Sequence, residues 1–160
     1  MILNRFNRIL SSLAVACSVS VLPSCSQFDE PGTGSFIRMN VSVETNSVSV
    51  PDFALSESSP FHVVGFAREK QCEPFYRLFE SDAYSKDGSL TWMGKDREWP
   101  GEYMKFVAYW PADADVYIDT KGNVVSADCV LIAETTPACH LDPTVSLTFQ
   151  AINEYFYGNE

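Results

Sequence analysis

Apolar and polar residues alternate along two stretches of this sequence. In residues 37–44 every second side chain is apolar, and polar side chains stand between them. Residues 103–110 repeat the pattern, and Pro111 ends it. Because successive side chains of a strand point to opposite faces, a period of two predicts a strand with one buried face. The apolar positions of the two runs are Ile37, Met39, Val41, Val43, Met104, Phe106, Ala108 and Trp110.

Elsewhere, short apolar segments are separated by turn signals. Asp87-Gly88 and residues 119–122 each lie between two such segments and favour tight hairpins. No stretch carries a sustained helical stripe. Short strands with frequent turns are typical of an antiparallel sandwich or barrel, so we predict an all-β fold, a single antiparallel β-sandwich. The further predicted strands cover residues 61–67, 75–79, 89–92, 116–118, 123–125, 129–133 and 145–149.

The same patterns predict which side chains fill the core. Apolar residues at the inward positions of the first, central and last runs are expected to be buried. The predicted core includes Ile37, Met39, Val41, Val64, Phe66, Phe106, Ala108, Leu131, Leu147 and Phe149.

The first 24 residues have the composition of an export signal. Arg5 and Arg8 give a positive start, and an apolar run follows over residues 9–22. This run is shorter than the roughly 20 residues that a membrane-spanning helix needs. We therefore interpret residues 1–24 as a signal peptide.

The end of this segment predicts a lipid anchor. Leu22-Pro23-Ser24-Cys25 resembles the lipobox of bacterial lipoproteins, where the peptidase cuts ahead of a cysteine that carries the lipid. Cys25 is the predicted lipidation site, and the covalent lipid is the only cofactor that we expect. Cys17 is a competing site but would leave too short an apolar core, and secretion without a lipid is the alternative. The predicted location is the outer membrane of a Gram-negative envelope, at the cell surface.

Two further regions follow the signal. Residues 25–35 contain Gly, Pro and Ser and predict a flexible tether, in which Asp29-Glu30 resembles an acidic surface-sorting tag. Residues 36–160 have the length of one domain.

Charge and motifs exclude several classes of function. The net charge of −10 becomes more negative when the signal leaves with its two arginines, so nucleic acid is not an expected partner. There is no C-x-x-C or G-x-S-x-G motif, and His62 and His140 are far apart, so we expect neither a metal site nor an enzyme. Asp113, Asp115 and Asp119 match no calcium loop. The three tryptophans offer a sugar platform or, as we prefer, core packing.

Three cysteines remain beside Cys25. Export permits a disulfide, and Cys129 and Cys139 are close enough in sequence to close a loop. Cys72 would then be unpaired. Buried free thiols at these positions are the open alternative.

Several motifs of residues 61–149 resemble a known family when taken in order. The most specific motif is the run from Trp99-Pro100 to Tyr109-Trp110-Pro111, which has the form W-P…F-x-A-Y-x-P. The other motifs are Phe61-His62-Val63-Val64-Gly65-Phe66-Ala67, residues 84–92, the run Asp128-Cys129-Val130-Leu131-Ile132-Ala133 and the L-x-F run of residues 145–149. Behind a lipobox, this order is similar to the N-terminal domain of the fimbrillin family, lipoprotein-derived pilus subunits and related surface proteins of Gram-negative anaerobes.

The resemblance implies a transthyretin-like β-sandwich and a role in fimbriae or adhesion. Family pilins are cut after an arginine, which frees the first strand, and a strand of another subunit fills the groove. The candidate processing sites here are Arg38 and Arg68, because residues 44–60 contain no basic residue. The implied partners are outer-membrane lipid through Cys25, other fimbrillin-type subunits, and a host or bacterial surface ligand.

The chain departs from the family pattern after the first domain. It stops at Glu160, where family members continue into a second domain. A truncated gene and a single-domain relative both explain this. The prediction is therefore either a structural or adhesive subunit, including a truncated, anchor-like relative, or a stand-alone surface lipoprotein that binds a glycan or host protein through its loops.

Overall fold

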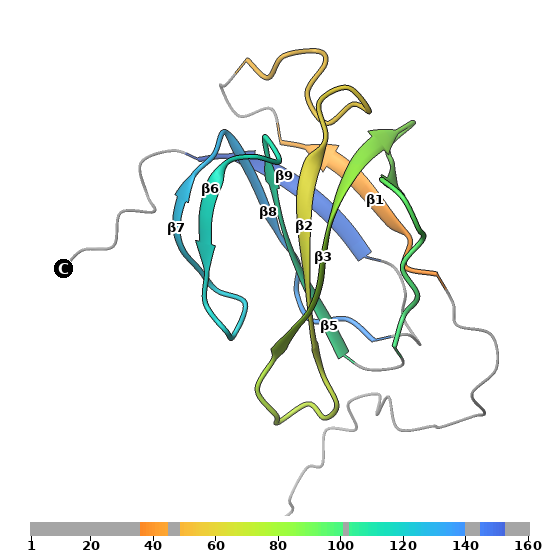
Figure 1. The fold of residues 1–160 in the computed structure, drawn as a ribbon, viewed down its shortest axis with the longest axis vertical. Helices are drawn as coiled ribbons and strands as arrows, with labels where there is room; N and C mark the ends of the chain where they lie inside the picture. Colours follow the sequence, from red (N-terminus) through yellow and green to blue (C-terminus); the bar gives the residue numbers. More distant parts are fainter. Residues whose placement is uncertain (1–35, 45–48, 101–102, 140–144, 153–160) are drawn as a thin grey trace, which may run out of the picture.

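The computed structural model describes residues 36–44, 49–100, 103–139 and 145–152. Within these ranges the chain forms strands and turns and contains no helix, which confirms the all-β prediction. No helix in the described part has the length and apolar character needed to cross a membrane. The strands, drawn in Figure 1, are β1 (Met39–Val43), β2 (Phe61–Arg68), β3 (Tyr76–Lys86), β4 (Ser89–Trp92), β5 (Tyr103–Trp110), β6 (Asp115–Ile118), β7 (Val124–Asp128), β8 (Leu131–Glu134) and β9 (Val145–Ala151).

Seven of these strands close into one barrel, in the order β1-β4-β3-β2-β5-β8-β9. All neighbouring pairs are antiparallel except β1 and β9, which run parallel and lie side by side in Figure 1. The expected plain antiparallel sandwich is therefore wrong, because the sheet closes on itself and contains a parallel pair. The two strands of that pair are far apart in sequence, so no turn signal in the sequence predicts that they pair.

The barrel interior is the larger of two apolar clusters. Phe61, Phe106 and Phe149 are completely buried there, and Phe61 meets the edge of the Phe149 ring at 5.0 Å between ring centroids. All three tryptophans are buried, which agrees with core packing and leaves no exposed tryptophan platform. The apolar faces predicted from alternation in β1 and β5 both point into this interior.

The β6–β7 hairpin forms the second cluster on the outside of the barrel. Val64 and Phe66 of β2 and Val107 of β5 pack there against Ile118 of β6. Strand β2 is therefore buried on both faces, which explains why residues 61–67 read as a continuous apolar run rather than an alternation. Every residue of the predicted core is buried, but Val64 and Phe66 belong to this outer cluster.

The turn between β3 and β4 has the geometry that its sequence predicts. Asp87 and Gly88 both adopt positive φ angles, 52° and 76°. Two left-handed residues in succession match the right-handed twist of the flanking strands, and Asp-Gly adopts this conformation at low cost. This turn lies next to β1, because the amide of Val41 donates to the carbonyl of Gly88 at 2.7 Å.

Candidate functional site

Strand β1 closes the barrel through two unequal seams. On one side it pairs with β9 over five consecutive residues, from Met39 opposite Val145 to Val43 opposite Phe149. On the other side a single pair, Asn40 opposite Ser89, joins it to β4. The barrel is therefore firmly paired at the β1–β9 seam and weakly paired at the β1–β4 seam.

The segment just before β1 adds a few contacts to the weak seam. The amide of Ile37 donates to the carbonyl of Arg97 at 2.7 Å, and Phe36 forms an isolated bridge with Glu98. The indole of Trp92 donates to the carbonyl of Ile37 at 3.4 Å. Residues 36–37 thus bond mainly to the loop after β4 rather than to β4 itself.

The inward side chains of this segment fill one side of the core. Ile37, Met39 and Val41 are 3%, 3% and 8% exposed, whereas Asn40 and Ser42 face outward. Without β1, the barrel interior would be open between β9 and β4, and the backbone groups of β9 on that side would lack partners. An extended segment with apolar residues at alternate positions has the right shape to occupy this position between β9 and β4, which we call the seat of β1.

The two candidate processing arginines have different surroundings. Arg38 is exposed and lies one residue before β1, between the buried side chains of Ile37 and Met39. Arg68 is the last residue of β2, and its guanidinium lies over the rings of Phe75 and Tyr103 at 4.5 and 5.5 Å from the ring centroids. Neither arginine lies between β1 and β2.

The predicted cysteine pairing is wrong. Cys129, like Cys72, is a free thiol, so the Cys129–Cys139 disulfide is not formed. The reason is the position of β8. The amide of Val130 bonds to Trp110 and that of Ala138 to Met104, at opposite ends of β5. Six residues of strand separate these points by about 20 Å, far beyond the reach of a disulfide.

The surroundings of Cys129 disfavour the thiolate form of its side chain. Half-burial of Cys129, helped by the charge of Asp128, raises the pKa of its thiol to about 11.

The lipidation site at Cys25, like the tether and the signal peptide, does not fall on residues that the structure describes.

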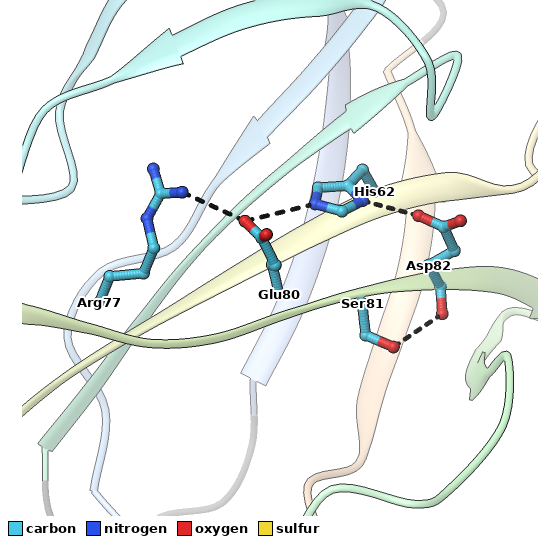
Figure 2. Close-up of polar contacts among 5 residues, drawn as sticks. All are labelled: His62, Arg77, Glu80, Ser81 and Asp82. Atoms are coloured by element: carbon cyan, nitrogen blue, oxygen red, sulfur yellow. Dashed lines mark hydrogen bonds and ion pairs between the residues drawn. The ribbon is translucent and has the colours of Figure 1, made fainter.

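A polar cluster that the sequence did not reveal lies on the outer face of β2, β3 and β5. His62 is directly opposite Asp82 on β3 and Tyr109 on β5. Its Nδ1 lies 2.6 Å from Oδ1 of Asp82, and its Nε2 lies 3.9 Å from Oε2 of Glu80. Figure 2 shows His62 between the two carboxylates, with Arg77 contacting Glu80 at 3.1 Å.

The side chains of this cluster form a network of ion pairs and hydrogen bonds on the surface of the sheet. Burial, followed by the charges of Glu80 and Asp82, raises the pKa of Tyr109, whose ring lies 5.3 Å from that of His62. The hydroxyl of Ser81 donates to the carbonyl of Asp82 and not to His62. The contacts of His62 are with the carboxylates of Asp82 and Glu80.

No group of ligating side chains in the described ranges could hold a metal ion.

Asp119 of the β6–β7 turn accepts hydrogen bonds from backbone amides of the same turn. The carboxylate of Asp119 accepts from the amides of Lys121 and Asn123, each at 2.8 Å. These hydrogen bonds to the charged form lower the pKa of Asp119 and cap the turn.

Comparisons with protein-family models, with curated proteins and with solved structures find no match to this chain. The unevenly paired β1 is the feature of the described chain that bears most directly on the strand exchange expected from the sequence motifs.

Proposed function

We propose that this protein is a fimbrillin-like surface lipoprotein, anchored in the outer membrane through Cys25 and acting as a structural or adhesive component of fimbriae. The proposal assigns it no catalytic role. Its sequence support is the lipobox together with the ordered motifs of residues 61–149. The structural observation that carries it is the unequal pairing of β1, with five residue pairs to β9 and one to β4.

Strand exchange would take place at the seat of β1. A donor segment would run parallel to β9 and place apolar side chains where Ile37, Met39 and Val41 now lie. Main-chain hydrogen bonds would supply affinity, and the alternating pockets would set the register. The single residue pair with β4 makes that seam the natural place for the barrel to open.

The arginines favour an anchor-like member over a processed stalk subunit. A cut after Arg38 removes the tether but leaves β1 (Met39–Val43) in place. A cut after Arg68 also removes β2, which makes contacts with both β3 and β5 and carries part of both apolar clusters. Neither cut releases β1 alone, so exchange would require β1 to leave the barrel without being cut from the chain, and only a subunit that escapes both cuts stays on its lipid.

The anchoring half of the proposal is tested in cells. Cys25→Ser should abolish labelling by a fatty-acid analogue and release the protein from membranes, whereas Cys17→Ser should leave labelling intact. Labelling that persists in Cys25→Ser, or is lost only in Cys17→Ser, contradicts the anchor.

The exchange half is tested on the lipid-free domain. Deleting residues 36–44 should leave an open barrel that a synthetic peptide of that sequence restores, as read from the fluorescence of the buried tryptophans. A matched peptide with Met39 and Val41 changed to Asp should not restore it. Restoration by both peptides, or by neither, contradicts a sequence-specific strand seat.

A covalent lock provides an independent control. Ser42 and Thr148 are opposite residues whose hydroxyl oxygens lie 3.3 Å apart, so Ser42→Cys with Thr148→Cys should tie β1 to β9. The oxidised double variant should fold normally and lose incorporation into fimbriae, and reduction should restore it. Unchanged incorporation of the locked protein would show that β1 never leaves its seat.

A further inference from the structure

An open cleft of about 480 Å³ lies beside the β6–β7 turn, away from the β1 seat. Its walls come from the loop after β2, from β5, from the β6–β7 turn and from the segment that follows β8. In Figure 1 the β2–β3 loop and the β6–β7 turn both lie towards the lower end of the barrel. The volume is within the range of about 300–1,000 Å³ that is usual for small-molecule sites.

Lys105 is the most informative side chain in this cleft. It projects from the outer face of β5, and only 14% of its side chain is exposed. Its ammonium has two partners in the described chain, Asn123 Oδ1 at 3.5 Å and Glu134 Oε2 at 4.0 Å. Both distances exceed the range of about 2.7–3.2 Å for a good hydrogen bond, and an ammonium can donate three. A largely buried cation in this cleft therefore retains unused capacity to donate.

The charge that lines the cleft is balanced, unlike that of the whole protein. Lys105 and Lys121 line it together with Glu73 and Glu134. Two ammonium groups thus accompany two carboxylates, in a chain whose net charge is −10. Asp119 does not line the cleft, and its carboxylate accepts bonds within its own turn. In so acidic a chain, this balanced lining and the unused donor capacity of Lys105 allow an anionic group to bind here.

The remaining walls combine apolar surface with hydrogen-bonding groups. Phe75, Pro74 and Pro137 supply apolar surface, and Phe75 is half-buried. Glu134 and Thr136 are exposed and can accept hydrogen bonds from hydroxyl groups. A sugar ring has an apolar C–H face and a rim of hydroxyls, and it matches this combination better than a purely apolar ligand or a bare anion does.

We propose that this cleft binds a small carboxylated sugar of the hexuronic acid class. Lys105 and Lys121 contact the carboxylate, Phe75 and the two prolines contact the C–H face of the ring, and Glu134 and Thr136 bond to its hydroxyls. The site is separate from the seat of β1, so this proposal does not depend on strand exchange.

The test is an NMR titration of the full lipid-free domain with methyl glucuronide, methyl glucoside and acetate as probes. Methyl glucuronide should shift the resonances of Lys105, Asn123 and Thr136 saturably, and the other two probes should bind at least tenfold more weakly. Lys105→Met and Lys121→Met should each weaken the glucuronide about tenfold, as expected for loss of one charge-assisted contact. The control is Lys95→Met, an exposed lysine after β4 that should leave the affinity unchanged.

Three results would overturn the proposal. Equal binding of methyl glucoside would show that the cleft does not recognise the carboxylate. Equal binding of acetate would show that it does not recognise the sugar ring. Absence of saturable shifts at the cleft would remove the site altogether. Because Lys121 is exposed, its variant should keep the wild-type spectrum, so a loss of fold in Lys105→Met leaves the test decisive.

Discussion

Gly122 of the β6–β7 turn lies against the ring of Phe66 on β2. A Cβ atom added at this glycine would approach two ring carbons of Phe66 to 3.0 Å. The turn reaches this position because Gly122 adopts a φ of +78° and because Asp119 caps the residues around it. This contact seats the tip of the hairpin on the barrel, and the same turn forms one wall of the cleft that contains Lys105.

Gly122→Ala should therefore cost more stability than the same change at Gly88. The two glycines have nearly the same φ, +78° and +76°, but the nearest atom to an added Cβ at Gly88 is 3.9 Å away. Both variants should lose about 1 kcal/mol from left-handed strain, and Gly122→Ala about 1 kcal/mol more from crowding Phe66. Urea unfolding of the two variants measures the difference. Equal losses in the free energy of unfolding would contradict the contact.

Gly65→Ala should overpack the barrel interior. An added Cβ would lie 2.7 Å from the ring of Phe79, which is partly buried and packs edge-on against Trp92. We expect a loss of about 1–3 kcal/mol in the free energy of unfolding. In a Phe79→Leu background the same glycine change should cost less, because the ring is gone. A double-mutant cycle with no coupling between the two positions would rule out this explanation.

Phe106→Ala should be among the most destabilising single changes. Phe106 is completely buried, and its ring packs against Trp99 and Phe79 at centroid distances of 6.1 and 6.4 Å. The expected loss is about 3–5 kcal/mol in the free energy of unfolding. Val125→Ala, at a side chain that is 51% exposed, should change it by less than about 0.5 kcal/mol. A small effect at Phe106 would mean that this side of the barrel is not packed as described.

Cys129 should react slowly with iodoacetamide in the folded protein. Its thiol has a pKa of about 11 instead of 9.0, so at pH 8 it carries about a hundredth of the thiolate of an ordinary cysteine. The rate should rise as the pH approaches 11, and Cys72, which is exposed, should be modified first. After alkylation in denaturant without reduction, peptide mapping should find both residues alkylated. Recovery of Cys129 in a disulfide would contradict the free thiol.

Local sequence pattern determined the strands and the core. The alternation in residues 37–44 and 103–110 places side chains on fixed faces whatever the partner strand is, so the burial of Ile37, Met39 and Phe106 followed from the period of two. The Asp87-Gly88 turn was equally predictable, because its backbone preference depends on its own two residues.

Contacts between distant segments were decided only by the tertiary structure. The parallel pairing of β1 with β9 has no connecting turn that could encode it in the sequence. The ten-residue spacing of Cys129 and Cys139 led to a wrong disulfide prediction, because strand β8 holds the two residues apart. His62 meets Asp82 only once the register of β2 and β3 is set, and Lys105 enters a cleft only once the β6–β7 hairpin folds back over β5. Strand formation depends on neighbours in sequence, whereas closure, register and clefts depend on which distant surfaces bury each other most completely.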